Sequence, residues 1–149
     1  MKLRMKWMFS AALLALAMTA SGVLALDVVN YKSLAGVVWH QQDLYVTINS
    51  FTDQWKNVVG KNWYMTMTVQ NRGDDPATFD ASKIEIDDSK GTSFRAQPVT
   101  GAPQSELKQT LSPGGSAQFK VMFDGHIYFD RRTPAHLKYT LDTKVDIIK

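Results

Sequence analysis

The 149-residue chain contains no cysteine and only five prolines. It therefore has no disulfide bond, no thiol nucleophile and no cysteine ligand for a metal. The sequence also lacks the motifs G-x-S-x-G and H-E-x-x-H and any glycine-rich phosphate loop. We expect a protein that is not an enzyme, uses no cofactor and is held together by packing and hydrogen bonds alone.

Long apolar runs are absent except at the N-terminus. Lys2, Arg4 and Lys6 precede the apolar residues 7–20, and small residues follow. This order is typical of a secretory signal peptide. The competing interpretation is an uncleaved anchor, since about 20 apolar residues can span a bilayer.

Residues 23–25 (Val-Leu-Ala) fit the positions that a signal peptidase reads, which predicts cleavage before Leu26, with Ala20 and Gly22 as alternatives. We expect residues 1–25 to be the signal peptide. Residues 26–149 then form one domain that is secreted or associated with the cell envelope. The sequence leaves its oligomeric state open.

The mature chain has no excess charge of either sign. The whole chain carries 17 Lys and Arg against 14 Asp and Glu, a net charge of +3. Without the three cations of the predicted signal peptide, 17 − 3 = 14 cations balance the 14 anions. Bulk charge therefore gives no support for a nucleic-acid partner. A membrane partner is expected only if the signal segment stays uncleaved.

Alternating apolar and polar residues dominate the mature chain, and helical periodicity is missing. Such alternation gives a strand one buried face and one solvent face. The buried faces are predicted to include Leu44, Val46, Ile48, Trp63, Met65, Met67, Val69, Ile84, Ile86, Ala117, Phe119, Val121, Phe123, Leu137, Tyr139 and Leu141. The pattern predicts an all-β, immunoglobulin-like sandwich of two antiparallel sheets with about seven to eight strands. A small barrel is the alternative.

Turn residues separate the predicted strands. In the segment NRGDDP, Gly73 is expected to adopt a positive φ angle, and Asn71 is expected to cap the turn. Gly91 stands where a short hairpin loop needs a residue in the left-handed backbone conformation. Residues 97–110 form the longest stretch without alternation, and we expect them to cross between the sheets.

Three stretches carry a family resemblance: YMTMTVQNRGDDPATFD, IEIDDSKGTSFRA and LSPGGSAQFKVMFD. In this order and spacing they resemble bacterial secreted immunoglobulin-like domains of unknown function, of the telokin-like or immunoprotective extracellular protein type. The resemblance implies an exported β-sandwich, often attached to the cell envelope. It implies no catalytic residues.

Several short motifs are candidate functional sites. Arg72-Gly73-Asp74 matches an adhesion tripeptide, but each residue also suits a turn, so we interpret it as a corner. The acidic residues Asp74, Asp75, Asp80, Asp87 and Asp88 lack the D-x-D-x-D-G order of a calcium loop, which favours solvated turns.

A soft-metal site for copper is the alternative function, because Met and His are soft ligands. The candidate ligands are Met122, His126 and His136. Met122 is predicted on the solvent face of its strand, and no two histidines have a ligand-like spacing. A third hypothesis is that the protein is a hydrolase, which requires a Ser or Asp close to a His.

The leading hypothesis is a non-enzymatic binding or structural module whose partner is a protein or an envelope polymer. The partner is met through loops or an exposed sheet edge. The predicted contact residues are Trp55, Arg72, Asp74, Arg131 and Arg132. Among the tryptophans, Trp39 and Trp63 are expected in the core and Trp55 on the surface.

Overall fold

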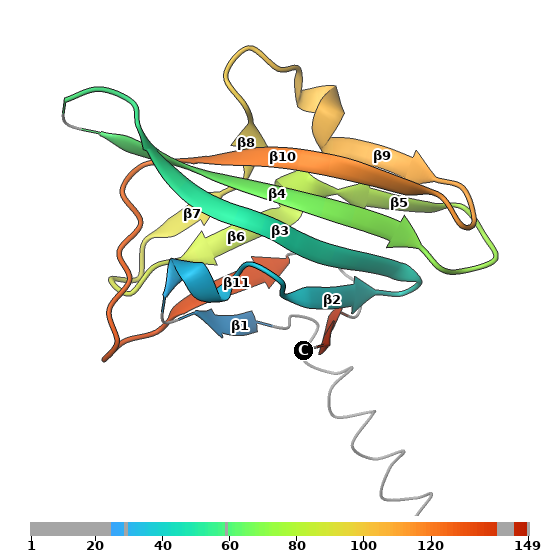
Figure 1. Ribbon diagram of the computed structural model, residues 1–149, viewed down its shortest axis with the longest axis horizontal. Coiled ribbons are helices and arrows are strands. Elements are labelled where there is room, and N and C mark those ends of the chain that lie inside the picture. The colour runs from blue at the N-terminus through green and yellow to red at the C-terminus, as the bar shows by residue number, and fades with distance from the viewer. Residues whose placement is uncertain (1–24, 29, 59, 140–144, 149) are drawn as a thin grey trace, which may run out of the picture.

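The chain folds as a two-layer antiparallel β-sandwich in a computed structural model that describes residues 25–28, 30–58, 60–139 and 145–148 (Figure 1). The four-stranded layer has the order β1-β11-β6-β7, and the six-stranded layer has the order β12-β2-β3-β4-β10-β8. A two-stranded sheet, β5-β9, lies at one margin. Within the described residues, no helix is long and apolar enough to cross a bilayer. The predicted all-β immunoglobulin-like sandwich is confirmed.

The described part of the chain contains more strands than expected, and three short 3₁₀ turns connect some of them. The strands are β1 (Ala25–Val28), β2 (Val38–Gln41), β3 (Leu44–Trp55), β4 (Lys61–Asn71), β5 (Ala77–Asp80), β6 (Ile84–Asp87), β7 (Ser93–Arg95), β8 (Gln97–Pro98), β9 (Lys108–Leu111), β10 (Ser116–Asp124), β11 (Ala135–Tyr139) and β12 (Val145–Ile148). The 3₁₀ turns are η1 (Tyr31–Ser33), η2 (Ala81–Lys83) and η3 (Gln104–Leu107). Residues 1–24 of the predicted signal peptide, and Leu141, lie outside the described residues.

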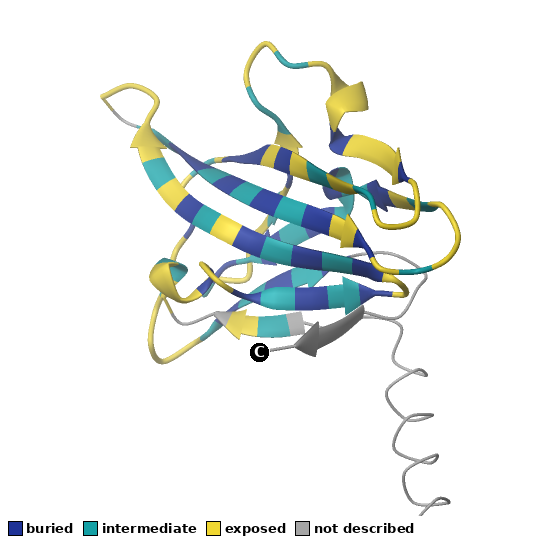
Figure 2. Cartoon of the chain, turned by 45° about the vertical axis from the view of Figure 1, so that its right-hand side comes forward, coloured by how far each residue is buried: buried dark blue, intermediate teal, exposed yellow. Residues whose placement is uncertain are grey.

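Buried side chains from the two layers meet face to face, as the alternation predicted. Figure 2 shows buried and less buried residues alternating along β3 and β4. Trp39 of β2 approaches Tyr139 of β11 across the layers, with ring centroids 6.2 Å apart, and Phe79 stacks on Tyr139 at 5.3 Å. Burial raises the pKa of the Tyr139 phenol. Trp63 and Met67 are also buried, and the predicted core is confirmed for every described residue except Ala117, which is partly buried.

Strand β3 is longer than its alternation indicated because it contains an irregularity. Its pairing with β4 shifts between Ile48 and Ser50, which leaves Asn49 as an extra residue. Such a bulge reverses the side-chain parity of the residues that follow. Ile48 and Phe51 are therefore both buried, although they are an odd number of residues apart. The bulge lets β3 run on to Trp55 as one arm of a long hairpin.

The corner after β4 is built around buried Asn71. Its Nδ2 donates to the carbonyl oxygens of Asp75 (2.8 Å) and Leu111 (2.9 Å), and its Oδ1 accepts from the Gly73 N–H (2.9 Å). The predicted capping role is confirmed. The positive φ predicted for Gly73 is wrong. Glycine is needed there because a Cβ would lie 2.6 Å from the Cβ of Asp43.

Two further connections follow the sequence predictions. Gly91 has a φ of +83°, as expected for the turn after β6. The chain leaves the four-stranded layer after β7 and joins β10 of the other layer through β8, so residues near 97 do cross between the sheets. The crossing uses buried Ala96, whose N–H donates to the Ile84 carbonyl oxygen at 2.9 Å.

Candidate functional site

Three connections gather at one end of the sandwich, on the left of Figure 1. They are the tip of the β3–β4 hairpin (residues 56–60, of which 59 is not described), the turn 88–92 and the connection 125–134. We call this surface, together with Trp55 beside the hairpin tip, the loop end. The Ser89 N–H donates to the Tyr128 carbonyl oxygen at 2.9 Å, which joins two of the connections. Lys56 Nζ lies 3.4 Å from Asp124 Oδ1, which ties the hairpin to the end of β10.

The large hydrophobic side chains that are exposed all lie at the loop end. Among the described residues there are three of them: Trp55 is 70% exposed, Val58 97% and Tyr128 43%. Isolated exposed hydrophobic residues are ordinary on protein surfaces. Three lie at one end and none elsewhere in the described part of the chain, which makes the loop end the candidate contact surface.

Each exposed aromatic ring has a cation beside it. Lys61 Nζ lies 4.5 Å from the ring centroid of Trp55, and Lys90 Nζ lies 3.6 Å from that of Tyr128. Lys61 also contacts Asp53 Oδ2 at 2.8 Å. The hydrogen bond from Lys61 outweighs burial and lowers the pKa of Asp53. The site therefore combines flat apolar surfaces with ammonium groups.

The connection 125–134 is anchored on the core by aromatic packing. The ring centroid of Phe129 lies 5.5 Å from Trp63, 6.2 Å from Phe51 and 6.3 Å from Tyr31. Trp63 is 4% exposed. The contacts with Trp63 and Phe51 are edge-on, and such contacts between rings add to the energy of burial. Phe129 therefore fixes the backbone that presents Tyr128.

A buried carboxylate, Asp88, holds the turn 88–92 in place. Its Oδ1 accepts from the N–H groups of Lys90 and Thr92, both at 2.9 Å, and its Oδ2 accepts from the Tyr128 N–H at 3.3 Å. Asp88 is only 5% exposed, so the expectation that it lies in a solvated turn is wrong. Its hydrogen bonds join the turn 88–92 to the connection 125–134.

A family model for a domain of unknown function, DUF4352, matches residues 35–144. The chain belongs to the DUF4352 family. The predicted membership of a family of immunoglobulin-like domains of unknown function is thereby confirmed. A search of curated proteins found no match to this chain.

Two solved structures are similar to this DUF4352 chain. The yjhA protein of Bacillus subtilis has a TM-score of 0.43 and 14% identity, over 60% of this chain and 70% of that chain. MPT63, a secreted protein of Mycobacterium tuberculosis, has a TM-score of 0.42 and 18% identity, over 69% of this chain and 76% of that chain.

The residues predicted as a contact surface of the DUF4352 domain fall at two opposite ends. Trp55 is exposed at the loop end, as predicted, and Arg131 and Arg132 are exposed in the connection 125–134. Arg72 and Asp74 lie at the other end of β4, in the corner before β5. The five residues therefore do not form one surface.

Arg72-Gly73-Asp74 is a corner, in agreement with the sequence interpretation. The Arg72 guanidinium lies 4.0 Å from the ring centroid of Tyr45, and its Nε donates to Gln70 Oε1 at 2.9 Å. The Arg72 N–H donates to the Asp43 carbonyl oxygen at 2.9 Å. The arginine is thus folded back on the sheet beside Tyr45.

The three candidate soft-metal ligands are not brought together. Met122 points away from the core as predicted, but it is only 8% exposed. Strand β8 pairs with β10 at this residue, and Thr100 Oγ1 lies 3.9 Å from its sulfur. His136 lies on the outer face of the other layer, so the two cannot share a metal. His126 is exposed at the loop end, beside Tyr128. Within the described residues, no group of three His, Asp or Glu side chains is placed to hold a metal.

One carboxylate lies close to a histidine, which is the requirement stated for a hydrolase. His136 Nδ1 is 2.6 Å from Asp27 Oδ1, across the β1–β11 pair. The Asp27 side chain is 67% exposed and the His136 side chain 41%. The nearby hydroxyl of Ser93 donates to Asp87 at 2.6 Å. The pair therefore links the edge strand β1 to its neighbour.

Sequence reasoning missed Val58, Lys90 and Tyr128. Val58 stands in a turn where polar residues are usual, and this oddity was the available signal. Tyr128 falls in a stretch without alternation, so nothing in the sequence indicated which way its ring points. The pairing of Lys90 with Tyr128 joins residues 38 positions apart and depends on the fold.

Proposed function

We propose that this DUF4352 domain is an exported, non-enzymatic binding module that contacts an envelope polymer through its loop end. The observation that carries the proposal is the exposure of Trp55, Val58 and Tyr128 at one end of the sandwich. The proposal of a binding module also draws support from the core, because the buried aromatic rings pack against one another.

The chemistry beside these rings supports an anionic glycan as the polymer. An indole or phenol ring offers a flat apolar surface to the C–H face of a sugar. Lys61 and Lys90 place ammonium groups within 5 Å of the two rings. Arg131 and Arg132 add guanidinium groups on the same end, and guanidinium pairs well with phosphate and carboxylate.

Co-sedimentation with insoluble peptidoglycan tests the proposal. The exported protein is mixed with peptidoglycan that carries its anionic polymer and with peptidoglycan from which the polymer has been removed. We expect binding to the first, weakened at least tenfold by Trp55→Ser combined with Val58→Ser, because a few exposed anchors carry most of the energy of such contacts. Binding should also fall with added salt.

Arg72→Ser provides the matched control, since it removes an exposed side chain from the opposite end of β4. Both variants should unfold at the same urea concentration as the parent protein. Equal binding by parent and loop-end variant would refute the proposal. If the protein bound only to polymer-free peptidoglycan, the ligand would be a neutral glycan and the proposed anionic glycan would be wrong.

A further inference from the structure

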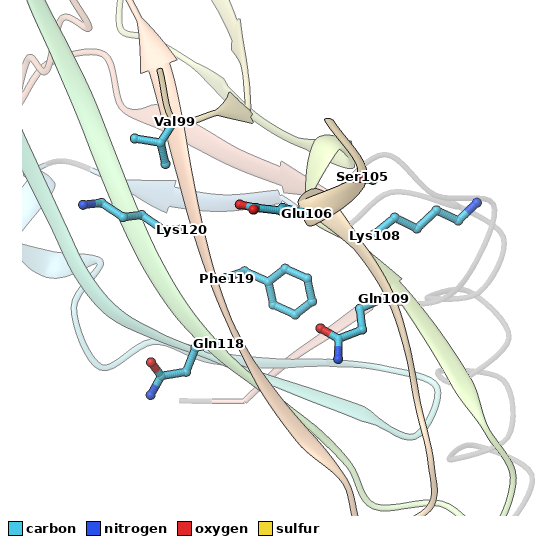
Figure 3. Close-up of a pocket in the computed structure, with 8 residues that line it drawn as sticks. All are labelled: Val99, Ser105, Glu106, Lys108, Gln109, Gln118, Phe119 and Lys120. Atoms are coloured by element: carbon cyan, nitrogen blue, oxygen red, sulfur yellow. The ribbon is translucent and has the colours of Figure 1, made fainter. Parts of the chain in front are cut away.

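A groove of about 600 Å³ lies between β9 and β10 (Figure 3). It is far along the sheet from the tip of the β3–β4 hairpin (Figure 1). Its lining comes from β9, β10, η3 and the residue after β8: Val99, Ser105, Glu106, Lys108, Gln109, Gln118, Phe119 and Lys120. The Phe119 ring occupies the centre of the groove in Figure 3 and is 3% exposed. It packs on Phe79 at 5.1 Å, so the groove has an apolar floor that belongs to the core.

In the described part of the chain, each strand that flanks the groove has one edge that is wholly or partly unpaired. β9 pairs with β5. β10 pairs with β4 along its whole length, but its outer edge pairs with β8 only at Val121 and Met122. Within the described residues, Ser116–Lys120 therefore have no strand beside them on the groove side.

The backbone groups on that edge can be assigned from the alternation of an antiparallel ladder. The Asn71 N–H donates to the Gly115 carbonyl oxygen, so odd-numbered residues direct their N–H and C=O groups toward β4. The even-numbered residues Ser116 and Gln118 direct theirs toward the groove. An exposed edge of this kind is a template for an added strand.

The charge in the groove indicates what the added strand should carry. The Glu106 side chain points into the groove in Figure 3. Among the described residues its carboxylate has no ion-pair or hydrogen-bond partner. Lys120 instead reaches toward the Tyr64 ring, at 5.4 Å. A cationic side chain beside Glu106 would complete the site.

We propose that the groove binds an extended peptide segment of a partner protein, which adds as a β-strand to the outer edge of β10 and places a Lys or Arg beside Glu106. Main-chain hydrogen bonds to Ser116 and Gln118 supply the affinity, and Glu106 supplies the selectivity, as in other cases of strand addition. This site is separate from the loop end and does not depend on the function proposed for it.

A phage-displayed library of random dodecapeptides, panned on the exported protein, provides the probe. We expect enriched peptides to contain Lys or Arg and to lack proline in the central residues. Gln118→Pro should weaken their binding about tenfold, because it removes the outward N–H while leaving the ladder with β4 intact. Gln118→Ala is the matched control and should bind within about twofold of the parent, since it keeps that N–H.

Two further measurements keep the proposal open to refutation if Gln118→Pro folds poorly. Amide hydrogen exchange should slow at Gln118 when the peptide binds and should stay unchanged at Phe119, which already faces β4. Glu106→Gln should weaken binding severalfold and remove its salt dependence. The proposal fails if enriched peptides bind Gln118→Pro and parent alike, if both amides respond equally, or if the edge is instead closed by a dimer of this chain in sedimentation velocity.

Discussion

Asn71 should be among the most costly polar residues to remove, because it satisfies three backbone groups of the corner after β4. Its side chain donates to the carbonyl oxygens of Asp75 and Leu111 and accepts from the Gly73 N–H. The side chain is fully buried. In Asn71→Ala these three groups lose their partners, and water reaches them only in part.

The size of the effect follows from the burial of each bond. The bond to the Leu111 carbonyl is buried, and leaving such a group unpaired costs about 1–3 kcal/mol. The other two bonds are partly buried and contribute about 1 kcal/mol each. We therefore expect Asn71→Ala to lower the free energy of unfolding by about 3–5 kcal/mol.

Urea unfolding followed by tryptophan fluorescence measures this loss as a shift in midpoint at constant slope. Asn49→Ala is the control, because Asn49 is exposed and makes one side-chain bond, to Thr68 Oγ1 at 2.8 Å. It should cost about 0.5 kcal/mol or less. Asn71→Asp should be no better than Asn71→Ala, since its carboxylate would face two carbonyl oxygens. A loss below about 1 kcal/mol for Asn71→Ala would refute the conclusion that Asn71 holds the corner after β4 together.

Three further predictions concern the corner, an ion pair and the N-terminus. Gly73→Ala should destabilise the fold by about 1–3 kcal/mol, and Asp43→Gly should rescue it where Asp43→Ala does not, because the clash includes the Asp43 Cβ; urea midpoints of the double variants decide this. Burial raises the pKa of Asp87, but bonds from Lys138 and Ser93 outweigh it and hold the pKa below 3.8. The stability that the contact between Lys138 and Asp87 confers is present above pH 3.8, the ordinary pKa of an aspartate, and is lost as the pH falls through the lower pKa of the folded state. Lys138→Met should therefore lose less stability than the parent protein between pH 5 and pH 2 in acid titrations, and an unchanged profile would contradict this. Mass spectrometry of the exported protein should find Leu26 as the first residue.

The alternation of side chains could be read from the sequence because it follows from strand geometry alone. Trp63, Met67 and Phe119 were placed in the core, and Trp55 outside it, without knowledge of which strands pair. Gly91 was found for a similar reason, since a short hairpin turn has a fixed local requirement.

The errors concern residues whose surroundings come from distant parts of the chain. Gly73 is required because Asp43 approaches it, and no local pattern contains that contact. Met122 alternates as a solvent-facing residue, yet it is buried beside β8 and Thr100. Asn49 is an extra residue only relative to its partner strand. In each case the prediction would have needed contacts between residues that are far apart in the sequence.

The loop end combines an anchored residue, Tyr128, with a projecting one, Val58. This difference affects how much each residue should contribute to the affinity for a partner. Tyr128 is held by Asp88 and by the packing of its neighbour Phe129 on the core, so little ordering is needed before a partner meets its ring. Val58 projects from the hairpin tip and is almost fully exposed. Because binding loses affinity for every group that must be ordered, the anchored ring should contribute more per contact than the tip. Weakening the anchor with Phe129→Leu should then reduce binding at the loop end although Phe129 itself lies against the core.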